Sequence, residues 1–184
     1  MSKIWDIAEK RIHNVFDGHQ QEVYSLDFST DGQLIVSGSG DETVRIWDMV
    51  DGTSKVLTIN DHDSLNNDAG VVSVAISPNG QYVAAGSMDG VVRIWDVSTG
   101  QLVERLRGHS DSVCSVAFTP DGKGLVSGSW DKTLKFWDLS GMSAVAKRKS
   151  DGKRDDKSSP CTMNFTSHKV HFLFTFSIGA DDHV

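Results

Sequence analysis

The segment Val36-Ser-Gly-Ser-Gly-Asp-Glu-Thr-Val-Arg-Ile-Trp-Asp48 decides the fold. Its last three residues, Ile-Trp-Asp, occur again at residues 4–6 and 94–96, and residues 136–138 read Phe-Trp-Asp. The tryptophans of these four motifs are 42, 48 and 42 residues apart. A rare, bulky residue at a nearly constant interval of this length indicates a repeat architecture, in which each repeat is one structural unit.

The repeat extends well beyond the tryptophan. Residues 19–48 align with residues 109–138 without a gap, and 14 of the 30 positions are identical. Each copy begins with Gly-His and continues with an alternating strand, an Asp-Gly turn, a second strand ending in Ser-Gly-Ser and a third strand ending in Trp-Asp. A weaker fourth strand follows at residues 55–59 and, after the middle copy, at residues 102–106. Short β-rich runs separated by turns at this spacing predict an all-β fold.

The middle copy keeps this plan with two departures. Its strands are expected at residues 71–76, 83–87 and 91–95. Its histidine is His62, and a polar insertion at residues 63–70 separates that histidine from the first strand. Ala85 stands where the other two copies have the first serine of Ser-Gly-Ser.

The composition excludes several classes of protein. The 184 residues carry a formal net charge of −7, which argues against unaided binding to a nucleic-acid backbone or to an anionic membrane. The two cysteines, Cys114 and Cys161, lack the spacing of a zinc site or a disulfide framework. The N-terminal residues lack the apolar core of a secretory signal, and no apolar stretch is long enough to span a bilayer. We therefore expect no metal, no cofactor and no membrane partner.

Four strands in about 42 residues, with Gly-His at one end and Trp-Asp at the other, resemble the WD40 repeat. The resemblance covers about residues 1–140. It implies an all-β fold, a partial WD40 β-propeller with about three complete four-stranded blades and flanking fragments. The implied divisions are the closing strands of a preceding blade at 1–17, blades at 18–60, 61–107 and 108–140, a charged flexible linker at 141–160, and a divergent or truncated start of a further blade at 161–184.

Serine, histidine and aspartate recur at fixed spacing in two repeats, which raises the question of a hydrolase. A catalytic triad is needed once per site and also needs an oxyanion hole, and no Gly-x-Ser-x-Gly motif is present. The resemblance instead implies a structural tetrad, in which the histidine links the aspartate to the serine and the serine accepts from the tryptophan indole. We therefore expect no enzyme activity and two structural tetrads, formed by His19, Ser37, Asp41 and Trp47 and by His109, Ser127, Asp131 and Trp137.

The corresponding set in the middle repeat is incomplete. It comprises His62, Ala85, Asp89 and Trp95, and the alanine has no oxygen to accept from the indole. We expect this blade to be softer than its neighbours, or to pack differently at that end.

Basic residues recur two positions before each of the three tryptophans in the complete repeats. They are Arg45, Arg93 and Lys135. Such repetition predicts a strand position that faces solvent rather than an anion site.

Residues 83–96 and 102–106 narrow the resemblance. These segments contain Ala-Ala-Gly-Ser followed by Leu-Val-Glu-Arg-Leu, and their sequence resembles that of the Tup-type fungal transcriptional corepressor. Residues 16–28 and 36–48 resemble the same family. The propeller of that family is recruited by DNA-bound repressors, pairs with a tetratricopeptide-repeat partner and engages histone tails, without reading nucleic acid itself. The resemblance implies a non-enzymatic scaffold, or a truncated remnant of one, in the nucleus or otherwise the cytoplasm. Another WD40 adaptor, such as a substrate receptor of a ubiquitin ligase, is the alternative.

Propellers of this family commonly bind partners on the face where the first strand of each blade begins. By position, that face should carry Glu22, Tyr24, Met88, Ser112, Cys114 and Trp130. Tyr24 and Trp130 are of the residue types enriched at binding hot spots. The alternative is that either side chain packs on a neighbouring loop.

Overall fold

The described strands form one hairpin and three four-stranded antiparallel sheets. The computed structural model describes residues 2–60, 68–142 and 161–166. The hairpin contains β1 (Ser2–Asp6) and β2 (Arg11–Phe16). These elements confirm the prediction of an all-β chain with three four-stranded units. The described residues contain no helix long and apolar enough to cross a membrane.

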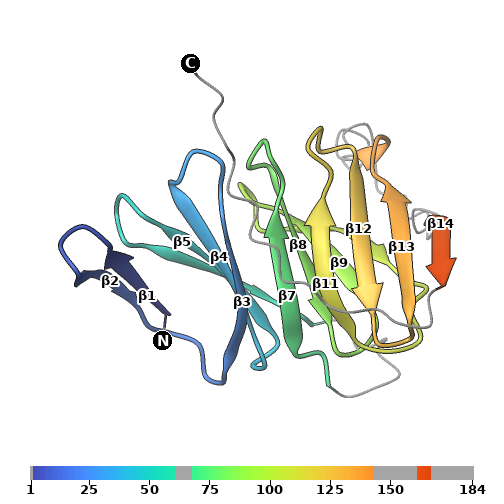
Figure 1. The fold of residues 1–184 in the computed structure, drawn as a ribbon, viewed down its shortest axis with the longest axis horizontal. Coiled ribbons are helices and arrows are strands. Elements are labelled where there is room, and N and C mark those ends of the chain that lie inside the picture. The colour runs from blue at the N-terminus through green and yellow to red at the C-terminus, as the bar shows by residue number, and fades with distance from the viewer. Residues whose placement is uncertain (1, 61–67, 143–160, 167–184) are drawn as a thin grey trace.

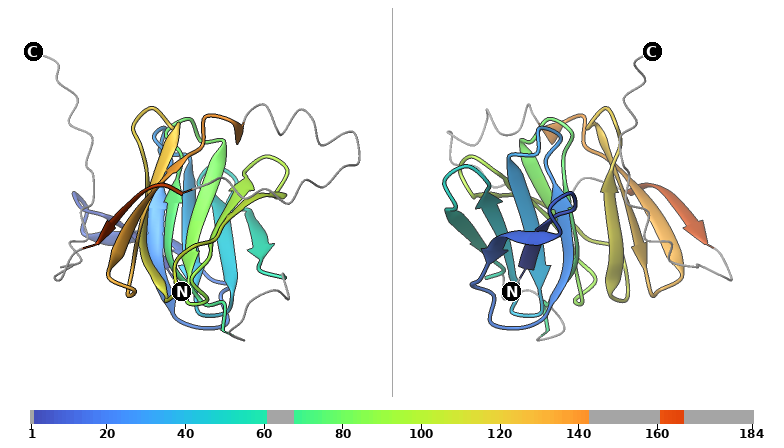
Figure 2. Two further views of the ribbon diagram at one scale, coloured as in Figure 1. Left: turned by 90° about the vertical axis from the view of Figure 1, so that its right-hand side faces the viewer. Right: turned by 60° about the vertical axis from the view of Figure 1, so that its left-hand side comes forward.

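Each sheet is a simple meander, in which consecutive strands are neighbours. The first sheet contains β3 (Val23–Phe28), β4 (Leu34–Ser39), β5 (Thr43–Asp48) and β6 (Ser54–Thr58). The middle sheet contains β7 (Val71–Ile76), β8 (Tyr82–Ser87), β9 (Val92–Asp96) and β10 (Leu102–Leu106). The third sheet contains β11 (Val113–Phe118), β12 (Gly124–Ser129), β13 (Thr133–Asp138) and β14 (Cys161–Thr166). The sheets stand beside one another in chain order, with the hairpin at one end of the row and β14 at the other (Figures 1 and 2).

The same glycine turn joins the first and second strands of every sheet. Gly32, Gly80 and Gly122 all have φ near 68°, a left-handed backbone that glycine adopts without steric cost. In the first sheet the Asp31 carboxylate accepts from the Gln33 amide at 3.0 Å, which holds the turn closed. The turn fixes the register of each strand pair, so the apolar residues of both strands reach the same face.

The core lies between neighbouring sheets. The first strand of the middle sheet, β7, packs mainly against β3 and β4 of the first sheet, and β11 packs against β7 and β8 of the middle sheet. Val36 and Val44 of the first sheet and Val71 of β7 are all fully buried in this way. Full burial of a valine is worth roughly 1.5–3 kcal/mol relative to leaving it in water. A Cβ on Gly38 would lie 2.5 Å from the Val71 side chain, so this glycine permits the close approach of β7.

Hydrogen bonds also join neighbouring sheets. The Val74 amide in β7 donates to Ser25 Oγ in β3 at 3.1 Å. The Val116 amide in β11 donates to Ser73 Oγ in β7 at 3.1 Å, one repeat further along. The serine at the third position of a first strand therefore fixes how the first strand of the next sheet is aligned along it.

The C-terminal part differs from the expected division of the chain. Residues 161–184 were expected to begin a further blade, yet β14 pairs with β13 and is the fourth strand of the third sheet. Composition alone could not make this assignment, because residues 139–160 separate β14 from its partner in the sequence. The expected linker at 141–160 lies almost entirely outside the described residues, as do His62 and residues 167–184.

Candidate protein-interaction site

A buried hydrogen-bond network ties the first sheet together. His19 Nδ1 lies 3.0 Å from Asp41 Oδ2, and His19 Nε2 lies 2.7 Å from Ser37 Oγ. The Trp47 indole donates to the same serine oxygen at 2.8 Å. With a proton on Nδ1, the histidine donates to the aspartate and accepts from the serine hydroxyl, so every group is satisfied.

The third sheet has the same network at equivalent positions. His109 Nδ1 lies 2.8 Å from Asp131 Oδ2, and His109 Nε2 lies 2.7 Å from Ser127 Oγ. The Trp137 indole donates to Ser127 Oγ at 2.8 Å. The network joins the segment before the first strand to the second strand, the following turn and the third strand, so it holds that end of the sheet in one register.

Burial and hydrogen bonding set the charges of these groups. Burial lowers the pKa of both His19 and His109, and the hydrogen bonds to their aspartates offset only part of that shift. Burial alone would raise the pKa of Asp41, but hydrogen bonds from Thr43, Gln20 and His19 together hold it at about 2. The pKa of Asp131 is lowered in the same way. At neutral pH the two histidines are therefore neutral and the two aspartates are ionised.

The expected partner-binding residues lie at one edge of the sheets, where the first strands begin. Backbone hydrogen bonds place them there, because the residue before each first strand accepts from the turn between the second and third strands. Gly40 donates to Glu22, Met88 to Gly70, and Trp130 to Ser112, at 2.9–3.0 Å. The start face is the surface formed by Glu22, Tyr24, Met88, Ser112, Cys114 and Trp130.

Two large aromatic side chains stand out from the start face. Trp130 is 64% exposed and Tyr24 is 49% exposed. The two side chains occupy different positions of the repeat. Tyr24 is the second residue of β3, and the equivalent residue of the third sheet is Cys114. Trp130 lies in the turn between β12 and β13. Trp130 lies against Cys114, and burial raises the pKa of that thiol. Most of the surface of the Trp130 residue is nevertheless open to solvent.

The family follows from a comparison with known proteins. The model of the WD40 family, described as the WD domain, G-beta repeat, matches residues 10–48, 53–96 and 100–138, which is more than half of the chain. This chain belongs to the WD40-repeat family. The three matches run through the three sheets described above.

Three WD40 relatives illustrate how much is shared. WD repeat-containing protein 37 of Homo sapiens is 39% identical over 66 residues, which is 35% of this chain and 13% of that protein. The peroxisomal targeting signal 2 receptor of Homo sapiens is 46% identical over 66 residues, 34% of this chain and 20% of that protein. The U3 small nucleolar RNA-associated protein 15 homolog of Xenopus tropicalis is 36% identical over 75 residues, 36% of this chain and 14% of that protein. The aligned segments are a fifth or less of the length of each relative.

The middle WD40 repeat satisfies its buried aspartate in another way. Arg93 donates to Asp89 through both terminal nitrogens, at 2.7 and 3.1 Å, and to Ser87 Oγ at 3.2 Å. The Arg93 side chain is only 1% exposed, so the expectation of a solvent-facing position is wrong here. Ala85 is the register partner of Arg93 and presents only a methyl group to it. The alanine that leaves the tetrad incomplete therefore stands beside the arginine that now holds the aspartate.

The basic residues at the equivalent position of the other two repeats are also less exposed to solvent than expected. Lys135 is buried, which again contradicts a solvent-facing position. Arg45 is half-buried: its Nη2 donates to the Gly18 carbonyl at 2.8 Å, and its guanidinium lies 5.6 Å from the centre of the Trp47 ring. Sequence reasoning missed the role of Arg93. The available signal was the coincidence of an alanine at the serine position with an arginine four residues after the aspartate.

Proposed function

We propose that this chain is a non-enzymatic protein–protein interaction scaffold whose partners bind the start face. The observation that carries the proposal is the exposure of Trp130 on a turn whose backbone is hydrogen-bonded to Ser112. Tryptophan and tyrosine contribute large contact areas at low entropic cost and are enriched among residues that dominate binding energy. Strand ends held by buried tetrads supply the rigid support that such anchors need.

The burial of the serines argues against catalysis by the tetrads. The Ser37 and Ser127 residues are 0% exposed, and each hydroxyl oxygen already contacts a histidine and a tryptophan. A nucleophile must come within about 3–3.5 Å of the carbon it attacks. No substrate reaches an oxygen that is enclosed in this way, so the resemblance to a catalytic triad is one of composition.

The finer proposal is a scaffold of the Tup-like corepressor type that acts in the nucleus. Residues 83–96 and 102–106 support it through their resemblance to that family. Its partners would be DNA-bound repressors, a tetratricopeptide-repeat protein and histone tails. One relative is named for association with a nucleolar RNA, which is in keeping with a nuclear location. Another is named as the receptor for a peroxisomal targeting signal, which supports a protein-binding role but not the nuclear location.

Affinity capture from extract of the cells that express the protein tests the proposal. The captured partners of the unaltered chain are compared with those of Trp130→Ala, Tyr24→Ala and Val50→Ala. Val50 is the matched control, because it is exposed in the β5–β6 turn at the opposite edge of the sheet. Recovery of a tetratricopeptide partner or histones, lost only with the start-face variants, supports the corepressor. Recovery of ubiquitin-ligase subunits would instead support the ubiquitin-ligase adaptor. Equal capture by all variants would show that partners do not bind the start face.

A further inference from the structure

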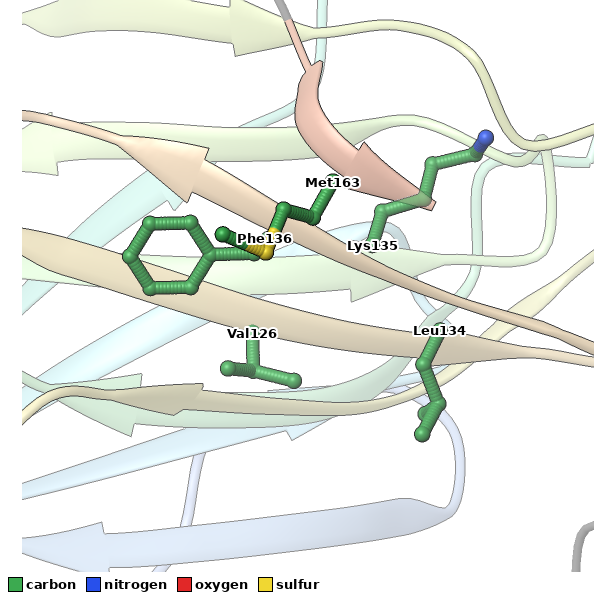
Figure 3. Close-up of a pocket in the computed structure, with 5 residues that line it drawn as sticks. All are labelled: Val126, Leu134, Lys135, Phe136 and Met163. Atoms are coloured by element: carbon green, nitrogen blue, oxygen red, sulfur yellow. The ribbon is translucent and has the colours of Figure 1, made fainter. Parts of the chain in front are cut away.

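The third sheet ends the row with an apolar surface. It is formed by Val126 of β12, Leu134 and Phe136 of β13 and Met163 of β14, with the stem of Lys135 beside them (Figure 3). These side chains line a hollow of about 220 Å³. This surface is termed the end face.

The end face repeats surfaces that are covered elsewhere in the molecule. Val126 occupies the repeat position of Val36 and Ala84, and both of those are fully buried. Leu134 likewise corresponds to Val44 and Val92, which β7 and β11 cover completely. Val126 and Leu134 are instead 38% and 37% exposed. The end face thus presents apolar side chains at the positions that first strands cover in the two interfaces within the chain.

We propose that residues 173–178, Leu-Phe-Thr-Phe-Ser-Ile, bind the end face as the first strand of a fourth blade. These residues lie outside the described part of the chain. The first strands β7 and β11 read Val-Val-Ser-Val-Ala-Ile and Val-Cys-Ser-Val-Ala-Phe. All three segments have apolar residues at positions one, four and six, which are the positions that β7 and β11 turn towards the preceding sheet. All three have a small hydroxyl residue at position three.

The connection has the required length and starts at the required edge. Thr166 at the end of β14 is paired with Thr133, so β14 ends at the start face, as β6 and β10 do. Residues 107–112 suffice to lead from β10 to β11. Residues 167–172 provide a connection of the same length from β14 to the proposed strand.

The end face also offers the polar and steric features of the two covered interfaces. Ser25 and Ser73 each accept a hydrogen bond from the amide of the fourth residue in the first strand of the next sheet. Ser115 is their equivalent in the third sheet, and it is exposed. Phe176 would supply the matching amide. Gly128 is the equivalent of Gly38 and Gly86, which make room for the first residue of the next strand. The WD40 family match stops at residue 138, so the proposed strand extends the repeat beyond it.

Disulfide trapping in the full chain tests this docking. The cysteines replace Gly128 and Leu173, in a background of Cys114→Ser and Cys161→Ser. At the covered interfaces a Cβ on the glycine would lie 3.3 Å (Gly38 to Val71) and 3.1 Å (Gly86 to Val113) from its partner's Cβ, just below the range of about 3.5–4.5 Å found in disulfides. After mild oxidation and proteolysis, mass spectrometry should find the 128–173 link within one chain. The control, Gly128→Cys with Phe174→Cys, should form at least about tenfold less, because alternate residues of a strand point to opposite faces.

Hydrogen exchange of the unaltered chain keeps the proposal testable if the cysteine variant does not fold. The Phe176 amide should exchange at least about tenfold more slowly than in a free peptide of residues 167–184. Equal exchange rates would overturn the proposal. So would a 128–173 link that forms only between two chains, since a second copy would then cover the end face, and so would equal linking in the register control.

Discussion

Arg93 and Asp89 form a bidentate ion pair inside the middle sheet, with both side chains at least 99% buried. The first and third sheets place a histidine beside the corresponding aspartate. The WD40 repeats of this chain therefore bind the buried carboxylate at the end of each sheet in two ways. A histidine reaches it from the preceding loop, or an arginine reaches it from the neighbouring strand.

We expect Arg93→Met to destabilise the chain by about 3–5 kcal/mol, because it leaves the Asp89 carboxylate buried without a counter-charge. Urea unfolding followed by tryptophan fluorescence measures the change. The double variant Arg93→Met with Asp89→Asn should lose less free energy of unfolding than the sum of the two single variants, because Asp89→Asn removes the carboxylate that Arg93→Met leaves unpaired. Arg45→Met is the matched control, because its guanidinium is bonded to a carbonyl group rather than to a carboxylate. Equal losses for Arg45→Met and Arg93→Met would contradict the assigned role.

We expect Ser37→Ala to cost about 1–3 kcal/mol, because the buried Trp47 indole and His19 ring both lose their partner at Ser37 Oγ. Ser127→Ala should behave alike in the third sheet. Thermal unfolding of each variant measures the loss, and circular dichroism confirms that the strands remain. Ala85→Ser in the middle sheet is the informative comparison. A stability gain there would show that Trp95 uses the added acceptor, and a loss would show that Arg93 leaves no room for the hydroxyl.

The sequence predicts the strands well because their signals are local. The expected first strand at residues 71–76 coincides with β7, since a turn glycine and alternating apolar residues determine it. The position of Arg93 could not be predicted in the same way. Its surroundings depend on Ala85 across the sheet, so burial at that position is a tertiary property. The pairing of β14 with β13 is likewise tertiary, because the intervening 22 residues (139–160) carry no pairing signal.

Acid should destabilise the chain in two steps. The pKa values of His19 and His109 are lowered from 6.5 by burial, so the unfolded chain binds protons more readily below that pH. Their contribution to stability is complete above pH 6.5 and is lost as the pH falls towards the folded-state pKa. The pKa of Asp41 is lowered from 3.8 to about 2, so its contribution is present above pH 3.8 and is lost between those values.

Melting temperature measured from pH 8 to about pH 2 tests this dependence. The double variant His19→Gln with His109→Gln should be less stable throughout and should lack the step below pH 6.5. The decline below pH 3.8 should persist, because Thr43 and the Gln20 amide still hydrogen-bond the Asp41 carboxylate. A step below pH 6.5 of unchanged size in the double variant would assign it to other histidines.

Trp130 should dominate binding at the start face if a histone tail is a ligand. A fluorescently labelled histone-tail peptide provides the probe, and anisotropy gives the dissociation constant. Truncation of an exposed aromatic anchor costs about 2 kcal/mol or more, which corresponds to roughly 30-fold weaker binding for Trp130→Ala. Trp130→Phe should retain much of the affinity, because an aromatic face remains, and Val50→Ala should bind as the unaltered chain does. The net charge of −7 also predicts weaker binding of this basic peptide at higher salt. Salt-sensitive binding that is indifferent to Trp130→Ala would show that charge alone attracts the peptide, and that the start face has another partner.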